Sequence, residues 1–208
     1  RTRLTELGDR GLFEIQVLSP RYDGAVGITA LNKSLRVVAH HVLYKEVIDP
    51  ERATCIGDKV IQTKNDYQVG LMNGDQGVVM STSGCVNTET GRSEPGWIVE
   101  VMRGDKRERV NVPLSRTSGF MHAYAITVHR FQGSEAEHVI GAIHSEHGDY
   151  MLNRPLIYTT STRASKTLTL VGDRGGLYDG TKRDNTAHRR TLTAPKWLVN
   201  KLRLDPAT

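Results

Sequence analysis

The sequence changes its pattern twice along its length, and this change constrains the fold more than any single motif does. Residues 13–18 alternate as a strand does and stop at a Ser-Pro pair, after which Ile28, Leu31 and Leu35 recur with helical spacing. A strand, a glycine-bearing loop and a helix in this order indicate a βα unit. This pattern ends near residue 55 and returns near residue 117.

The segment between these two parts, residues 56–116, has the pattern of a small all-β unit. Gly, Asn, Asp and Ser separate several short β runs, and Asn73-Gly74 is a strong turn pair. The runs are Lys59–Gln62, Gln76–Met80, Trp97–Met102 and Glu108–Leu114. Strands of this length and spacing predict a small barrel or sandwich.

After Phe120 the sequence again has an α/β pattern. Met121–Phe131 and Leu152–Arg163 are predicted to be helical, and Val139–Ile143 and Leu168–Val171 to be buried strands. We therefore predict an α/β domain interrupted by an all-β insertion. Its parts are residues 1–55 and 117–180 for the α/β domain, 56–116 for the insertion, and 181–208 for a loosely ordered basic tail.

The charge of the chain is concentrated in its tail. The net charge is +5, and residues 181–208 alone hold 7 basic and 2 acidic residues. Such a surplus fits either a nucleic-acid contact or a solvated terminal segment, and the sequence leaves both open. No apolar stretch approaches the length of a membrane span. We expect a cytoplasmic protein, because its two cysteines have neither metal nor disulfide spacing.

The sequence also predicts that two features, a metal site and ATP hydrolysis by the chain alone, are absent. His144 and His147 lack a third ligand at suitable spacing, so we expect no metal site. His40 and His41 are predicted to lie on a helix surface. No Gly-x-x-x-x-Gly-Lys-Ser/Thr loop occurs in the chain, so we expect that it does not hydrolyse ATP alone.

Three polar stretches are candidates for function. In the first, Thr127 and His129 have the spacing to reach one backbone phosphate, and the stretch then runs into the turn Gln132-Gly133-Ser134-Glu135. Gly133 lets the backbone approach a phosphate closely, and Glu135 can accept hydrogen bonds from a ribose. Read from the residues alone, this segment is more often an ordinary loop.

The second and third stretches offer an arginine and a polar turn. Arg163, at the end of a polar helix, suits the moving charge of a γ-phosphate, although a surface salt bridge is the commoner role for one arginine. In the third, Lys64, Asn65 and Tyr67 combine charge, hydrogen bonding and stacking for a nucleic-acid strand. Ordinary turn chemistry explains the same residues.

The order of these stretches resembles the C-terminal motor domain of RecD-like superfamily 1 DNA helicases over residues 14–175. Tyr124–Glu135 resembles helicase motif V, Tyr158–Ala164 resembles motif VI, and Gly57–Gly77 resembles the SH3-like barrel inserted in that family. The resemblance implies a RecA-like parallel sheet, interrupted by the barrel, in the C-terminal half of an ATP-dependent helicase.

The same resemblance implies a role for each candidate residue. Arg163 corresponds to the arginine finger, and Gln132, Gly133, Ser134 and Glu135 to the ATP cleft. Thr127 and His129, with Lys64, Asn65 and Tyr67 of the barrel, correspond to contacts with single-stranded DNA. ATP and Mg²⁺ are then held mainly by a separate N-terminal RecA-like domain, and translocation runs 5′ to 3′. The rival interpretations are a stand-alone nucleic-acid-binding module without catalysis, and an adaptor built around the barrel.

Overall fold

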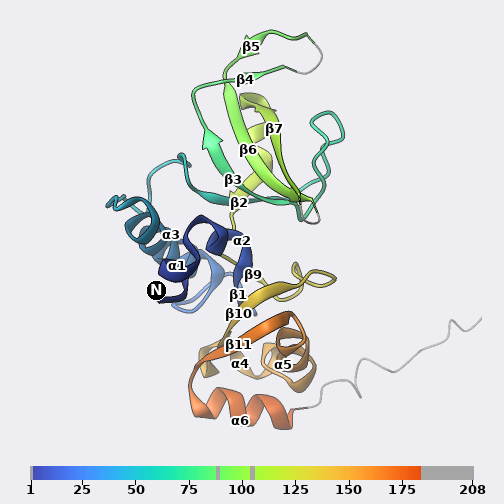
Figure 1. Cartoon of the computed structure of the whole chain (residues 1–208). Helices are drawn as coiled ribbons and strands as arrows, with labels where there is room; N and C mark the ends of the chain where they lie inside the picture. Colours follow the sequence, from blue (N-terminus) through green and yellow to red (C-terminus); the bar gives the residue numbers. More distant parts are fainter. Residues whose placement is uncertain (1, 88–89, 104–105, 184–208) are drawn as a thin grey trace, which may run out of the picture.

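The computed structural model describes residues 2–87, 90–103 and 106–183, which form two main β-sheets with helices around one of them (Figure 1). The predicted basic tail lies outside the described residues except for Thr181–Arg183. Within the described residues, no helix is both long enough and apolar enough to cross a lipid bilayer.

The helices and strands alternate in the first and last parts of the chain, while strands dominate the middle. The helices are α1 (Thr2–Leu7), α2 (Gly11–Glu14), α3 (Ile28–Tyr44), α4 (Gly148–Met151), α5 (Arg154–Ser161) and α6 (Arg174–Lys182), with 3-10 turns η1 (Gly8–Arg10), η2 (Leu114–Gly119) and η3 (Ser145–His147). The strands are β1 (Ile15–Ser19), β2 (Lys59–Gln62), β3 (Gln76–Ser81), β4 (Cys85–Val86), β5 (Ser93–Glu94), β6 (Gly96–Arg103), β7 (Lys106–Pro113), β8 (Phe120–His122), β9 (Ala125–Thr127), β10 (Ala136–Ile143) and β11 (Ala164–Gly172).

The first sheet has four parallel strands in the order β11-β10-β1-β9. Helix α5 packs on β10 and β11, whereas α3 contacts β9 and α2 contacts β10. The core between this sheet and α5 includes Leu18, Val139 and Ile143 from the strands, with Leu156 and Ile157 from the helix. The predicted α/β class with a parallel sheet is confirmed.

The second sheet has five antiparallel strands in the order β7-β6-β3-β2-β8. Its core is made of valines and a leucine from the strands and loops, namely Val60, Leu71, Val79, Val99, Val101, Val110 and Val112. The four predicted β runs of this segment correspond to β2, β3, β6 and β7. Strands β7 and β8 are the edges of the sheet, so closure into an SH3-like barrel stays a prediction, as do the proposed domain limits.

Strand β8 of the antiparallel sheet leads almost directly into β9 of the parallel sheet. Only Ala123 and Tyr124 separate the two strands, and both residues are buried. The prediction of a helix over Met121–Phe131 is therefore wrong. Its apolar run is buried on all sides, and such a run has no period that separates a helix from a strand. Pairing of β9 with the distant β1 decides in favour of the strand.

The other elements of the α/β part agree with the sequence in most respects. The predicted strands Val139–Ile143 and Leu168–Val171 lie inside β10 and β11, and the helix predicted over Leu152–Arg163 corresponds to α5. Asn153 caps α5 by accepting a hydrogen bond from Leu156 N at 3.0 Å, and proline lies in its first turn as expected. The first predicted strand begins later, at Ile15, because residues 13 and 14 complete α2.

Helix α3 buries a stripe of polar and charged residues that the spacing of its apolar residues did not predict. Asn32, Arg36 and His40 recur at four-residue intervals, and all three are buried. Asn32 exchanges two hydrogen bonds of 2.9 Å with the backbone of Ala125 in β9. The prediction that His40 lies on the helix surface is wrong, because its side chain has no exposed area; His41 alone is exposed.

Candidate functional site

The candidate residues of the α/β part lie at two opposite edges of the parallel sheet. Because its strands are parallel, Thr127 at the end of β9 lies at the carboxyl edge. Arg163 and the turn Gln132–Glu135 directly precede β11 and β10, so they lie at the amino edge. Strands β9 and β11 are also the two outer strands, so Thr127 and Arg163 stand at diagonal corners of the sheet.

At the amino edge, Arg163 lies against the turn before β10. Its Nη1 donates to Ser134 O at 3.1 Å, its Nη2 to Thr162 Oγ1 at 3.3 Å, and its carbonyl accepts from Ala136 N at 3.0 Å. The buried Nε has no hydrogen-bond partner, and Arg163 has no ion pair within the described residues. A guanidinium held by neutral oxygens keeps its charge available for an anion.

The turn beside Arg163 is open to solvent. Gln132, Gly133, Ser134 and Glu135 are all exposed. Gly133 has a φ of +86°, and a Cβ added there meets no atom within 4 Å. The glycine is thus required by the backbone conformation and not by crowding. The structure brings Arg163 and Ser134 into contact and leaves the surface of this turn accessible to a ligand.

At the carboxyl edge, Thr127 organises the turn that follows β9. Its Oγ1 accepts from Arg130 N at 3.0 Å and its carbonyl accepts from Phe131 N at 3.1 Å. His129 is exposed on this turn. It lines a hollow of about 100 Å³, together with Gln132 and residues around the start of α5, among them Tyr150. Gln132 therefore lies beside His129 as well as in the turn that leads to Arg163.

The third set of candidates lies on the loop between β2 and β3. Tyr67 is 76% exposed, and Lys64 and Asn65 are also exposed. Asn65 Nδ2 donates to Tyr67 Oη at 3.2 Å, while Asn65 Oδ1 accepts from Asn73 N at 2.8 Å. Both ends of the Asn65 amide thus hold the loop in shape, which leaves Lys64 and Tyr67 as its most available side chains.

This loop is braced against the rest of the antiparallel sheet. Arg116 binds both carboxylate oxygens of Asp66, at 2.9 and 2.8 Å. Thr63 donates through its N–H and its hydroxyl to Gly119 O, at 2.8 and 2.7 Å. The loop that presents Lys64 and Tyr67 is therefore held in place before any ligand binds.

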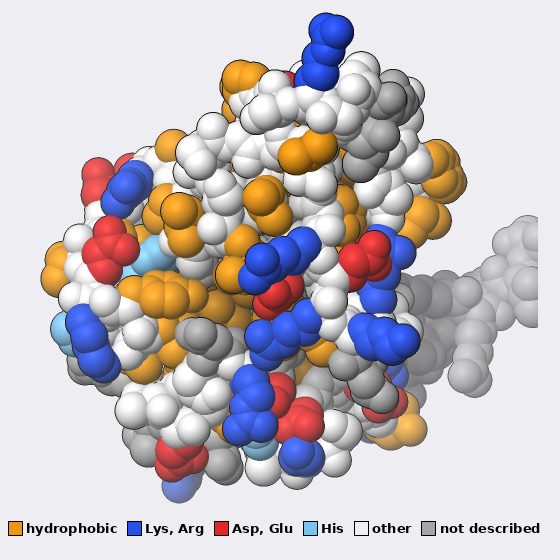
Figure 2. All heavy atoms as spheres, turned by 45° about the horizontal axis from the view of Figure 1, so that its top comes forward, with side chains coloured by type: hydrophobic (Ala, Val, Ile, Leu, Met, Phe, Trp, Pro, Cys, Tyr) orange, Lys and Arg blue, Asp and Glu red, His pale blue; other side chains and the backbone are white. Residues whose placement is uncertain are grey.

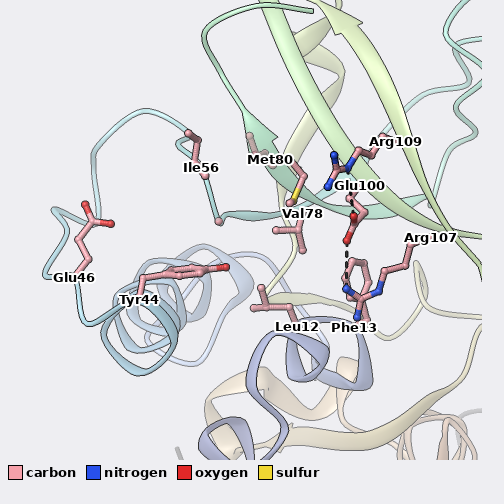
Figure 3. A pocket seen from close by; sticks show the side chains of 12 residues that line it. Leu12, Phe13, Tyr44, Glu46, Ile56, Val78, Met80, Glu100, Arg107 and Arg109 are labelled. Atoms are coloured by element: carbon pink, nitrogen blue, oxygen red, sulfur yellow. Dashed lines mark hydrogen bonds and ion pairs between the residues drawn. The ribbon is translucent and has the colours of Figure 1, made fainter.

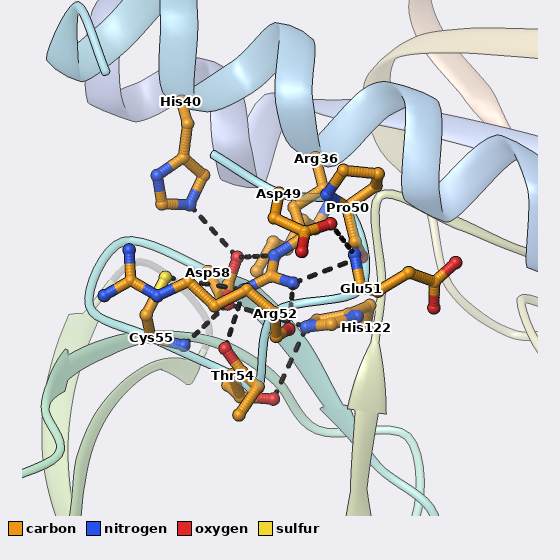
Figure 4. Close-up of polar contacts among 12 residues, drawn as sticks. Arg36, His40, Asp49, Pro50, Glu51, Arg52, Thr54, Cys55, Asp58 and His122 are labelled. Atoms are coloured by element: carbon orange, nitrogen blue, oxygen red, sulfur yellow. Dashed lines mark hydrogen bonds and ion pairs between the residues drawn. The ribbon is translucent and has the colours of Figure 1, made fainter. Parts of the chain in front are cut away.

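Sequence reasoning missed a buried polar seam between the two sheets (Figure 4). Arg36 binds Asp58 through Nε at 2.8 Å and Nη2 at 2.7 Å, and His40 Nε2 lies 3.1 Å from Asp58 Oδ1. Burial alone would raise the pKa of Asp58, but hydrogen bonds from His122, Arg36 and the Cys55 N–H hold it well below its usual range. Asp58 is therefore ionised and ties β2 to α3.

The next residue of the seam makes a different contact. Lys59 is buried, and its Nζ donates to Ile15 O at 3.1 Å and to Gln16 Oε1 at 3.0 Å in β1. Burial lowers the pKa of Lys59 to about 7. The sequence held one signal for these contacts, because Asp58 and Lys59 directly precede the apolar pair Val60 and Ile61. Charged residues in such a position are almost never buried without a partner.

Two groups of possible metal ligands occur among the described residues, and in both a carboxylate is already paired with a cation. His40, Cys55 and Asp58 offer ligand atoms within 4.8 Å of one another, but Arg36 Nη2 lies 3.4 Å from Cys55 Sγ and 2.7 Å from Asp58 Oδ2. A cation already occupies this position. The other group is Glu14, Glu137 and His138, in which Glu137 forms an ion pair with Lys166.

Part of the chain matches a known family model, and longer proteins match most of it. Residues 122–171, from the end of β8 to β11, match the UvrD-like helicase C-terminal domain. An ATP-dependent RecD2 DNA helicase of Deinococcus radiodurans is 37% identical over 159 residues, which are 76% of this chain and 20% of that protein. The RecBCD enzyme subunit RecD of Mycolicibacterium smegmatis is 31% identical over 56% of this chain and 18% of its own length.

Two further proteins are similar at lower identity. The conjugal transfer protein TraA of Rhizobium radiobacter is 29% identical over 64% of this chain and 11% of its own length. The solved structure of the Pif1 helicase from Candida albicans overlaps 86% of this chain and 49% of its own, with a TM-score of 0.49 and 13% identity. The chain spans about a fifth of the length of the first two relatives.

Proposed function

We propose that this chain, which is similar to the UvrD-like helicase C-terminal domain and to a RecD2 DNA helicase, is the second half of a RecD-like superfamily 1 helicase motor. In this role it supplies an arginine finger and DNA contacts, while a separate RecA-like domain supplies the ATP-binding loop. The activity belongs to the whole protein, an ATP-dependent DNA helicase. The chain alone is inactive toward ATP, because it lacks the Gly-x-x-x-x-Gly-Lys-Ser/Thr loop.

The state of Arg163 is the observation that carries this proposal. An arginine in a structural salt bridge has a carboxylate partner, whereas Arg163 has neutral oxygens and an unpartnered Nε. Such a cation fits the triphosphate of ATP bound on a facing domain, where it stabilises the charge that develops at the γ-phosphate. Gly133, Ser134 and Glu135 lie beside it in an accessible turn and would contact the same nucleotide. We assign Mg²⁺ to the facing domain.

The opposite edge of the sheet supports a separate role in DNA binding. Thr127 ends β9 there and His129 lies on the turn that follows, and we assign to them one phosphate of single-stranded DNA. Lys64 and Tyr67 on the braced loop would hold the strand further along by charge and stacking, with Asn65 keeping the loop in shape. ATP and DNA then act at opposite edges of one rigid sheet, and movement between the two halves becomes translocation, which we expect to run 5′ to 3′.

Substitution of Arg163 tests the motor role. In this chain joined to its ATP-binding domain, we expect Arg163→Ala to lower DNA-stimulated ATP turnover by about 10³-fold or more while ATP affinity changes little. Lys166→Ala, which removes an exposed charge from β11, is the control and leaves turnover unchanged. Full turnover in Arg163→Ala would exclude the arginine-finger role.

Substitution at the other edge tests DNA binding and separates the main alternative. His129→Ala and Lys64→Ala are expected to weaken binding of an oligothymidine to the chain, with a smaller dependence of affinity on salt. A stand-alone nucleic-acid-binding module would show the same losses but no effect of Arg163→Ala on any activity. If neither substitution nor the salt concentration changes the affinity for the oligothymidine, both the motor role and the nucleic-acid-binding module are excluded.

A further inference from the structure

A cavity lies where the antiparallel sheet meets α2 and α3 (Figure 3). Its volume is about 480 Å³, which is within the range of ligand-binding pockets. Its lining residues belong to α2, the end of α3 and the segment after it, the loop before β2, and strands β3, β6 and β7. None of the residues proposed to bind ATP or DNA is among them, so the cavity is separate from both edges of the parallel sheet.

One side of the cavity is apolar. Leu12, Val78 and Val79 are buried beneath it, whereas Tyr44, Ile56 and Met80 leave much of their surface in water. Ile56 is 58% exposed, although an apolar side chain of this size gains about 2 kcal/mol when it is fully buried. A partner side chain that covers Tyr44, Ile56 and Met80 would remove this surface from water.

The other side of the cavity presents two arginines that share one carboxylate. Arg107 Nη1 lies 3.4 Å from Glu100 Oε2, and Arg109 Nε lies 3.6 Å from Glu100 Oε1. The side chain of Glu100 is only 13% exposed, but those of Arg107 and Arg109 are 42% and 68% exposed. An incoming molecule therefore meets two oriented guanidinium groups with a covered carboxylate beneath them, and this side of the cavity attracts anions.

Apolar and basic groups adjoin on the outer surface as well. The space-filling view shows hydrophobic side chains next to basic ones near the middle of one face (Figure 2). Glu46, on the far wall of the cavity, is already engaged by Arg52 at 3.3 Å and lies 3.4 Å from His40 Nδ1. Glu46 is thus paired away from Arg107 and Arg109, and on their side of the cavity two guanidinium groups face the single carboxylate of Glu100.

We propose that this cavity is a docking site for an acidic peptide segment of a partner protein. An aromatic or aliphatic side chain of the segment lies against Tyr44, Ile56 and Met80. A neighbouring Asp or Glu side chain, or a C-terminal carboxylate, binds Arg107 and Arg109. Both arginines lie within ion-pair distance of Glu100 before binding, which lowers the side-chain entropy that is lost when the carboxylate arrives.

The lining favours a peptide over a nucleic-acid strand. No Asn, Gln, Ser or Thr side chain lines the cavity to read a base edge, and Arg107 covers the ring of Phe13 at 5.3 Å from its centroid. A second cavity of about 220 Å³ on the same sheet makes the contrast, since Gln68, Asn87, Asn111 and Ser115 line it. Aliphatic surface with guanidinium groups is the chemistry of an acidic, partly apolar peptide.

The test measures binding of a labelled peptide to the full 208-residue chain by fluorescence anisotropy. The probe is a ten-residue peptide of Gly and Ser that carries three Asp residues and one Trp. We expect saturable binding that weakens at least 10-fold when the Trp becomes Ala, and again when the Asp residues become Asn. Absence of saturable binding, or equal binding of the three peptides, would overturn the proposal.

Two variants on opposite sides of the cavity, each with a matched control, place the peptide. Ile56→Glu and Arg109→Glu are each expected to weaken binding of the Trp-Asp peptide at least 10-fold. Val47→Glu alters an exposed apolar residue outside the cavity, and Lys166→Glu reverses an exposed charge on β11, so both bind as the parent chain does. All these positions are exposed, and unfolding curves check that each variant remains folded.

Competition with DNA separates this proposal from the helicase function. If an oligothymidine displaces the peptide and Ile56→Glu and Arg109→Glu weaken oligothymidine binding equally, the cavity is a nucleic-acid site and the proposal is wrong. If Ile56→Glu abolishes peptide binding and leaves oligothymidine affinity intact, the proposal stands whatever the fate of the motor role. If Ile56→Glu and Arg109→Glu both bind the peptide as tightly as the parent chain does, the proposal is also wrong.

Discussion

Two arginines in different regions of the molecule show how environment divides one residue type into two roles. In the seam between the sheets, Arg36 has no exposed side chain, two bonds to Asp58 and further bonds to backbone carbonyls of residues 50–53. At the amino edge of the parallel sheet, Arg163 is partly exposed and contacts Ser134 O and Thr162 Oγ1. The first arginine has every partner that it needs, and the second still has room for one.

The partners already present around each guanidinium, and not the residue type, therefore separate a structural arginine from a candidate functional one. A buried ion pair is costly to form and still more costly to break in half, so the residues of the seam hold the fold together. An exposed cation without a carboxylate contributes little to stability and keeps its charge for a ligand. The same substitution made in each region should therefore have very different effects.

The largest expected effect is that of Arg36→Met. The substitution leaves Asp58 buried without its main partner, and we expect a loss of about 3–5 kcal/mol in the free energy of unfolding. Denaturation in urea measures this loss. Glu108→Ala, which removes an exposed ion pair with Arg103, is the control and changes stability by less than about 1 kcal/mol. If the two variants are equally stable, the seam does not hold the sheets together.

Acid should weaken the seam next. The pKa of Asp58 is lowered in the folded chain, so its contribution is complete above the unfolded pKa near 4 and is lost as the pH falls below it. Stability should therefore fall toward pH 2 with a slope of at most about 1.4 kcal/mol per pH unit from this group. Asp58→Asn should flatten this slope. An unchanged slope in the variant would assign the acid response to other carboxyl groups.

Lys59 should act in the opposite pH range and with a smaller net effect. Its pKa falls from its usual value to about 7 on folding, so between pH 7 and about 10 only the unfolded chain holds this proton. Stability then rises with pH across this window. Lys59→Met removes the rise, although at neutral pH relief from charge burial is offset by the loss of its bonds to Ile15 and Gln16. Unfolding measured at pH 6, 8 and 10 distinguishes the variant from the parent.

The smallest expected effect completes the comparison. Arg163→Met makes the same change as Arg36→Met, but it removes only two hydrogen bonds to neutral oxygens at the surface. We expect a change of less than about 1 kcal/mol in the free energy of unfolding. A loss as large as that of Arg36→Met would show that Arg163 has a structural role, and would weaken its assignment as an arginine finger.

The sequence predicts local patterns well and non-local partners poorly. Strands such as β2, β3 and β10 were predictable because their apolar runs end at turn residues. The helix predicted over 121–131 failed because β9 exists only through its pairing with β1, more than a hundred residues earlier. No local period carries that information.

The buried stripe of α3 was missed for a related reason. Asn32, Arg36 and His40 have helical spacing, yet a search for apolar residues passes over them. Their burial depends on Ala125 and Asp58, which belong to other elements. The candidate functional residues show the opposite case. Their order in the sequence suggested their roles, and these roles stay predictions. The cavity beside Arg109 could not be predicted from the sequence, because its lining comes from six separate segments.

The passage of β8 into β9 through Ala123 and Tyr124 makes the two sheets one mechanical body. A force applied to the loop at residues 63–75 passes from β2 to β8 through their hydrogen bonds. It then reaches β9 of the parallel sheet through the two residues that connect β8 and β9. Melting the antiparallel sheet first would strip Asp58 and Lys59 from their partners at the same moment. We therefore expect both sheets to unfold in a single cooperative transition. In the folded chain, a displacement of one sheet should move the other sheet with it.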